Sequence, residues 1–132
     1  MSVINTTFAE KFENNILSTW EEVYKKGQLT FWLLLAVKAS ARHMADIRGF
    51  IQEATNGTLT ADDQSLYRAL RRLHSMQLIN FQEEPSDQGG PDRKVYALSE
   101  TGQRVLGQFI ERNITGIFYK PEIKQLLEEG EK

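Results

Sequence analysis

Residues 60–76 read Thr-Ala-Asp-Asp-Gln-Ser-Leu-Tyr-Arg-Ala-Leu-Arg-Arg-Leu-His-Ser-Met, and this stretch decides the fold. Thr60, followed three residues later by Asp63, has the form of a capping box and predicts a helix over residues 61–76. At 100° per residue, one side of that helix carries a mostly apolar row: Leu66, Ala69, Leu70, Leu73 and Gln77. The opposite side is polar and basic: Gln64, Arg68, Arg71 and Ser75, with Arg72 on its flank.

The helices and strands predicted on either side of this helix follow the order of a known fold. Two helices are predicted before it, an almost wholly apolar one over residues 29–39 and an amphipathic one over 43–55. After it the period changes, and residues 78–82 and 94–98 read as strands joined by a polar tip that contains Gly and Pro. Three helices followed by a β-hairpin are the layout of a winged helix-turn-helix. We therefore expect an α+β fold, mostly α, with this domain over residues 29–98.

Further helices are expected at both ends of the chain. Residues 8–26 place apolar side chains on one helical face, at Phe8, Phe12, Ile16, Trp20, Val23 and Tyr24. Ser99 can cap another helix, which carries Val105, Leu106, Phe109 and Ile110. After Gly116 and Pro121, a short helix over residues 122–129 completes the chain.

These terminal helices offer more apolar surface than one small domain readily buries. A second chain is the economical explanation, because large exposed apolar patches usually mark contact surfaces. Residues 1–28 and 99–132 are accordingly predicted to be dimerisation segments on either side of the winged domain.

The charge of the chain is unevenly distributed. The 132 residues carry a net charge of −2 with a pI near 5.7, which excludes a uniformly basic coat. Residues 29–79, however, hold six Lys or Arg against four Asp or Glu, a local charge of +2. The second helix of a helix-turn-helix lies in the major groove, where Arg suits guanine or a phosphate and Gln suits adenine. The basic face of residues 61–76 is thus a candidate DNA-binding surface; the alternative is a solvated face that contacts nothing.

Two motifs resemble those of the PadR family of bacterial transcriptional regulators. Residues 65–73, Ser-Leu-Tyr-Arg-Ala-Leu-Arg-Arg-Leu, are similar to the family pattern Thr-Leu-Tyr-x-x-Leu-x-x-Leu. Residues 88–102, Gln-Gly-Gly-Pro-Asp-Arg-Lys-Val-Tyr-Ala-Leu-Ser-Glu-Thr-Gly, resemble its wing, Gly-Gly-x-x-Arg-Lys-x-Tyr-x-Leu-Thr-x-x-Gly. The resemblance extends over residues 29–109.

The resemblance implies a homodimeric repressor that binds a pseudo-palindromic operator in double-stranded DNA. Tyr67 and Arg68 would map to the DNA-facing start of the recognition helix, and Arg93 and Lys94 to the basic pair of the wing. With the polar helix face, the expected DNA-binding residues are Gln64, Ser65, Tyr67, Arg68, Arg71, Arg72, Ser75, Arg93 and Lys94. Some family members also bind flat aromatic effectors at the dimer interface.

One feature of the wing favours other functions. The tip is acidic, with Glu83, Glu84, Asp87 and Asp92. A winged helix that contacts only proteins would suit this tip and the low pI. A dimer that sequesters a ligand without binding DNA is a further alternative.

Aromatic residues are the candidates for an effector site. Trp20, Trp32 and Phe109 could line a pocket for a small aromatic molecule at the dimer interface. The alternative is that they serve only as core or interface packing, as aromatic residues at helical spacing usually do.

Several classes of function find no support in the sequence. Cysteine is absent, and the only histidines, His43 and His74, lie too far apart to suggest a zinc site, so no metal or cofactor is expected. No acid, base and nucleophile are arranged as in an enzyme. Residues 1–7 do not resemble a signal peptide, and the apolar run 31–37 is too short to cross a membrane, so a cytoplasmic protein is expected.

Overall fold

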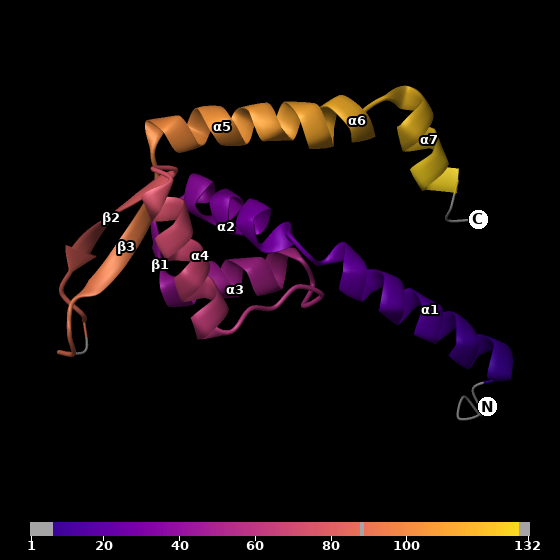
Figure 1. Ribbon diagram of the computed structural model, residues 1–132, viewed down its shortest axis with the longest axis horizontal. Helices are drawn as coiled ribbons and strands as arrows, with labels where there is room; N and C mark the ends of the chain where they lie inside the picture. The colour runs from indigo at the N-terminus through magenta and orange to yellow at the C-terminus, as the bar shows by residue number, and fades with distance from the viewer. Residues whose placement is uncertain (1–6, 88, 130–132) are drawn as a thin grey trace.

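The computed structural model of the chain describes residues 7–87 and 89–129. Residues 1–6 and 130–132 of the predicted dimerisation segments, and Gln88 of the wing motif, lie outside the described residues. Three helices form the domain with a β-hairpin beside them (Figure 1): α2 (Gln28–Ala39), α3 (Met44–Ala54) and α4 (Asp63–Ser75). The predicted winged-helix architecture is confirmed.

A small antiparallel sheet forms the wing. Strands β2 (Ile79–Glu84) and β3 (Arg93–Leu98) pair along their whole length, and β1 (Arg42–His43) adds to the other edge of β3, in the order β1-β3-β2. The hairpin agrees with the prediction but extends to Glu84 at the tip. Strand β1 was not expected, because two residues are too few to show the alternation that marks a strand.

The core lies between the three helices and the root of the wing. Its fully buried side chains are Leu33, Ile47, Ile51, Leu66, Leu70, Leu73, Ile79 and Leu106. The apolar rows predicted on each helix supply most of this core. Gln77, which the 100° step puts in the same row, instead lies beyond the end of α4 with a left-handed φ of 65°.

The start of α4 differs from the prediction. Asp62, not Thr60, is the N-cap, and its carboxylate accepts a hydrogen bond of 2.7 Å from the backbone N–H of Ser65. Asp is at least as good a cap as Thr, so the later of the two caps is used and the helix begins at Asp63.

Ser99 caps α5 (Glu100–Ile110), as expected, and also joins it to the wing. Its backbone N–H donates to the carbonyl of Leu78, and its hydroxyl donates to the carbonyl of Gln77. A Cβ at Gly102 would collide with the Leu78 carbonyl oxygen, so only glycine allows the first turn of α5 this close to β2.

The helix that begins with α5 does not end at Gly116. It passes through a π-helical turn, η1 (Glu111–Thr115), into α6 (Gly116–Phe118), and Figure 1 shows these segments as one rod. We call residues 100–118 the arm. Helix α7 (Pro121–Glu129) follows it, close to the predicted bounds.

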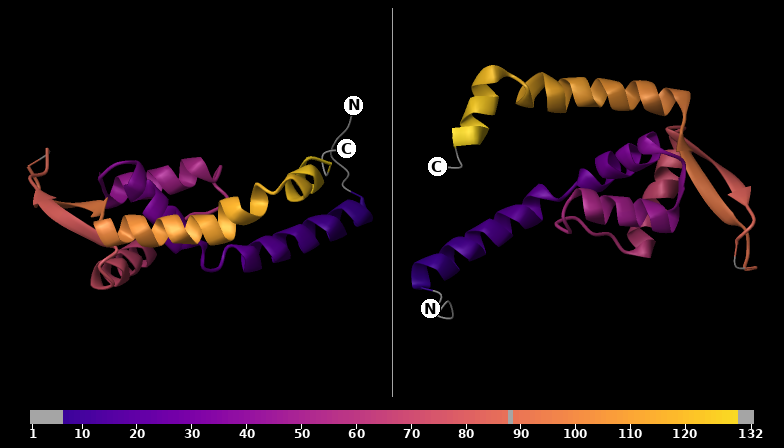
Figure 2. Two further views of the ribbon diagram at one scale, coloured as in Figure 1. Left: turned by 90° about the horizontal axis from the view of Figure 1, so that it is seen from above. Right: turned by 180° about the vertical axis from the view of Figure 1, so that it is seen from behind.

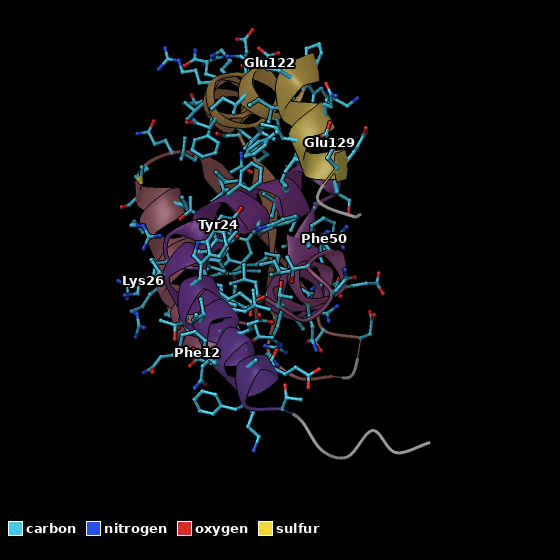
Figure 3. All side chains as sticks on the ribbon, turned by 90° about the vertical axis from the view of Figure 1, so that its right-hand side faces the viewer. Phe12, Tyr24, Lys26, Phe50, Glu122 and Glu129 are labelled. Atoms are coloured by element: carbon cyan, nitrogen blue, oxygen red, sulfur yellow. The ribbon has the colours of Figure 1, made fainter. Side chains whose placement is uncertain are left out.

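Helix α1 (Phe8–Tyr24) projects away from the domain on the side opposite the wing (Figure 2). A capping box between Thr7 and Glu10 starts it, yet none of its residues is buried. Figure 3 shows α1, with Phe12, and α7, with Glu122, as separate helices. The apolar face predicted for α1 is therefore present and uncovered.

Candidate nucleic-acid interface

Helix α4 directs its polar face away from the core. The leucines on the opposite face of the helix are buried in the core. The residues of the polar face are therefore all exposed: Gln64, Arg68, Arg71 and Ser75. Tyr67 is 46% exposed beside them, and the Arg71 guanidinium lies 5.7 Å from the centroid of its ring. Cations and hydrogen-bond donors thus gather on one side of a helix of the length that fits a major groove.

Two of the predicted DNA-binding residues also form contacts within the fold. The guanidinium of Arg72 donates a 3.1 Å hydrogen bond to the hydroxyl of Thr30, which ties α4 to α2. The backbone of Ser65 binds the capping carboxylate of Asp62, and its side chain is half-buried. These two side chains are therefore less free to reach a ligand than Arg68 or Arg71.

The acidic residues at the start of α4 are partly compensated. Asp63 forms an ion pair with Arg48 of α3 across the turn of the helix-turn-helix. Hydrogen bonds from Ser65, with Arg68 nearby, hold the pKa of the Asp62 carboxyl below its usual value. Both carboxylates thus have cations close to them, which weakens their repulsion of a phosphate.

An aromatic cluster joins the recognition helix to the wing. The rings of Phe81 on β2 and His74 on α4 lie 4.9 Å apart between centroids, and Tyr96 on β3 lies 5.7 Å from the same Phe81 ring. The ammonium of Lys94 lies 4.6 Å from the Phe81 centroid. Phe81 thereby sets where the Lys94 charge is presented relative to α4.

Sequence reasoning missed the role of Phe81. Strand alternation indicates only that Phe81 and Tyr96 face the same side of the hairpin, where they are a register pair. That this side faces His74 depends on how the hairpin packs on α4, which no local pattern encodes.

A hollow of about 690 Å³ lies between α4 and the wing. Its lining combines four basic side chains with aromatic and hydroxyl groups: Tyr67, Arg68, Leu70, Arg71, Arg72, His74, Ser75, Phe81, Lys94 and Tyr96. Burial, and then the nearby Tyr67, raise the pKa of Tyr96, so its hydroxyl stays protonated and can donate. Such a surface suits a phosphate backbone.

The cations of the wing stand opposite acids. In the hairpin register Lys94 pairs with Glu83, and Arg93 with Glu84. Arg93 is half-buried, and its Nε finds no acceptor within residues 7–87 and 89–129. The predicted basic pair is present, with one acidic residue opposite each cation in the hairpin register.

Comparison with known proteins identifies the family. The model of the transcriptional regulator PadR-like family matches residues 33–108, more than half of the chain. The chain belongs to the PadR-like family. Its members are transcriptional regulators and not enzymes. No curated protein matches the sequence.

Solved PadR-like structures share the fold. A PadR-like transcription factor from Bacteroides fragilis is 28% identical, with a TM-score of 0.57 over 69% of this chain and 84% of that one. A PadR family regulator from Eggerthella lenta is 19% identical, with a TM-score of 0.64 over 89% and 97%. Bacillus subtilis PadR, solved in complex with operator DNA, is 20% identical, with a TM-score of 0.56 over 62% and 46%.

The three effector candidates of this PadR-like protein do not line one pocket. Trp20 on α1 is 68% exposed, while Trp32 on α2 packs edge-on against Phe31, 5.7 Å between centroids. Phe109 lies 5.5 Å from Phe31 and lines an apolar pocket of about 170 Å³ between α2 and α5. Neither tryptophan lines that pocket.

The described residues of this PadR-like protein offer neither a metal site nor a membrane-spanning helix. Residues 7–87 and 89–129 contain no cluster of His, Asp or Glu suited to a metal ion. Within the same residues no helix is both long and apolar enough to span a bilayer.

Proposed function

We propose that this PadR-like regulator is a cytoplasmic protein that binds double-stranded operator DNA in a sequence-specific way, with α4 in the major groove and the wing along the backbone. The observation that carries the proposal is the hollow between α4 and the wing, where Arg68, Arg71 and Lys94 meet hydroxyl and imidazole donors. Arg68 and Arg71, on the most exposed side of α4, are the candidates for base contacts. Lys94 lines the hollow and Arg93 precedes it on β3, and a cation at either position suits a phosphate.

Local compensation supports binding in spite of the acidic total charge. Asp63 is paired with Arg48, so the first turn of α4 presents less free negative charge than its sequence indicates. The N-terminal end of a helix also favours phosphate through its unpaired backbone N–H groups.

We further propose that the active form is a homodimer. At ~150–250 Å² per aromatic side chain, the exposed parts of Phe8, Phe12, Trp20 and Tyr24 on α1 offer roughly 400–700 Å². Phe109, Phe118 and Tyr119 add roughly 230–390 Å² by the same measure. A stable interface needs about 800 Å² per partner, which lies within the combined range of roughly 630–1,090 Å² that these residues offer.

In a dimer of this kind, two α4 helices read half-sites of a pseudo-palindrome about one helical turn, roughly 34 Å, apart. Bound at a promoter, it represses by excluding the polymerase. A small aromatic effector would release the DNA if it prefers the dimer in which the two α4 helices are spaced differently; a preference of about 1–3 kcal/mol is enough. The pocket beside Phe109 is the candidate site for such an effector.

The proposal is tested by removing one cation from each DNA-facing element. Arg68→Ala and Arg93→Ala should each weaken binding to duplex DNA by about 5- to 100-fold, about 1–3 kcal/mol, and leave the dimer intact. Lys124→Ala on α7 makes the same charge change away from the wing and should have little effect. Loss of the dimer in Arg68→Ala, or equal weakening by Lys124→Ala, would contradict the assignment.

A further inference from the structure

The arm contains one turn that is not α-helical. In η1 the backbone N–H of Gly116 donates to the carbonyl of Glu111, five residues earlier rather than four. A π-turn of this kind holds one more residue than an α-helical turn, so the residues that follow it are set back by about 100° around the helix axis.

The side chains at this turn are suited to it. Two side chains of the π-turn donate to backbone carbonyls of the preceding turn. Asn113 Nδ2 donates to the carbonyl of Phe109 at 3.1 Å, and Thr115 Oγ1 donates to that of Ile110 at 3.5 Å. A Cβ at Gly116 would collide with the carbonyl oxygen of Glu111. Three polar or small residues within four positions therefore stabilise the π-turn.

The set-back changes which residues share a face. In an unbroken α-helix the midpoint of Ile117 and Phe118 would lie about 80° around the axis from the midpoint of Phe109 and Ile110. With the π-turn the same two midpoints lie within about 20° of each other. Phe109, Ile117 and Phe118 are all exposed, at 44%, 41% and 42%.

We infer that the π-turn sets the rotational register of the arm, so that Phe109, Ile117 and Phe118 form one apolar stripe that a second copy of this chain covers. The inference rests on the proposed homodimer. Within one chain α1, the other large apolar face, lies away from the arm (Figures 1 and 2), so it does not cover the stripe. Phe109 and Phe118 of the stripe, together with Tyr119 and the aromatic side chains of α1, reach the size range of a dimer interface. A symmetric pair covers both faces at once.

A substitution and a deletion test the register separately from the side chains. Gly116→Ala should expel the π-turn, because its Cβ cannot coexist with the Glu111 carbonyl, and should turn Ile117 and Phe118 out of the stripe. Deleting Asn113 in the Gly116→Ala chain removes the additional residue and leaves an unbroken α-helix with the stripe restored. Gly107→Ala, on the same helix with open space at its Cβ, is the matched control.

The dimer dissociation constant, measured by analytical ultracentrifugation, is the readout. We expect Gly116→Ala to raise it about tenfold or more, and the deletion in that background to return it to within about threefold of the wild-type value. Gly107→Ala should leave it unchanged. A Gly116→Ala chain that dimerises like wild type, or a deletion that fails to restore the dimer, would overturn the inference. A monomeric wild-type chain would instead overturn the proposed homodimer, and the stripe with it.

Discussion

The ammonium of Lys94 lies 4.6 Å from the centroid of the Phe81 ring, and the same ring contacts His74 of the recognition helix. One aromatic side chain thus fixes a wing cation relative to α4. Because a cation over a ring face is attracted by the ring quadrupole, Phe81 holds Lys94 where the wing meets the hollow.

Phe81→Leu keeps an apolar side chain on β2 and removes the ring. We expect duplex DNA affinity to fall about fivefold, about 1 kcal/mol, because Lys94 loses its fixed position. In the Lys94→Ala background the same substitution should cost little more, and fluorescence anisotropy on the four proteins measures this coupling. Strictly additive losses would show that Phe81 does not act through Lys94.

Two substitutions of Asp62 test its role as a helix cap separately from its negative charge. Asp62→Asn keeps a good N-cap and removes a negative charge near Arg68, so DNA affinity should rise and the melting temperature at pH 7 should fall only slightly. Asp62→Ala removes the cap and should lower the melting temperature. Equal melting temperatures for these two variants would mean that the cap does not stabilise α4.

The stability of the folded protein at acid pH should also depend on Asp62. Because its folded-state pKa is lowered, its contribution to stability is present above the unfolded pKa and is lost as pH falls through the folded value. Thermal melts of wild type and Asp62→Asn between pH 2 and pH 7 should therefore converge at the acid end. A constant difference across this range would contradict the lowered pKa.

Gly102 is required by the close approach of α5 to the wing. Gly102→Ala would drive a methyl group into the Leu78 carbonyl and should destabilise the fold by about 1–3 kcal/mol in chemical denaturation. Gly107→Ala, at an open helical site, should be neutral or stabilise by up to about 1 kcal/mol. Similar effects of the two substitutions would show that α5 does not pack as described.

The stability of the folded protein at alkaline pH should depend on Tyr96. Burial raises its pKa in the folded state, so its contribution to stability is present below the unfolded pKa and is lost as pH rises through the folded one. Tyr96→Phe should therefore lose less stability than wild type when denaturation is followed from pH 8 to pH 12. An identical decline in both proteins would mean that Tyr96 ionises as freely folded as unfolded.

Periodic features of the fold were readable in the sequence, and single contacts were not. Rows of apolar residues at helical spacing predict the three helices, and the alternation around Tyr96 predicts the hairpin. Both patterns are visible because they repeat over several turns or residue pairs. Strand β1 has two residues and no repeat. Gly116 is of a residue type that often ends helices, but its N–H bonds the Glu111 carbonyl and the helix continues to Phe118.

Part of the candidate site could likewise be predicted from periodic patterns, and part could not. The 100° step alone predicts the exposure of Arg68 and Arg71, whereas Arg93 and Lys94 came only from the resemblance to PadR proteins. The pairing of Asp63 with Arg48 and the contact of Phe81 with His74 join residues far apart in sequence. Such contacts depend on how the helices and the wing pack together.

The central claim is that α4 and the wing read a DNA sequence, and selection of duplexes from a random-sequence pool by the purified wild-type protein tests it most directly. We expect enrichment of a pseudo-palindrome that binds with a dissociation constant of about 10⁻⁸ M or lower, at least about 10³-fold tighter than the unselected pool, and whose affinity falls steeply as salt rises. No enriched sequence, with the selected duplexes bound no better than the pool, would contradict it.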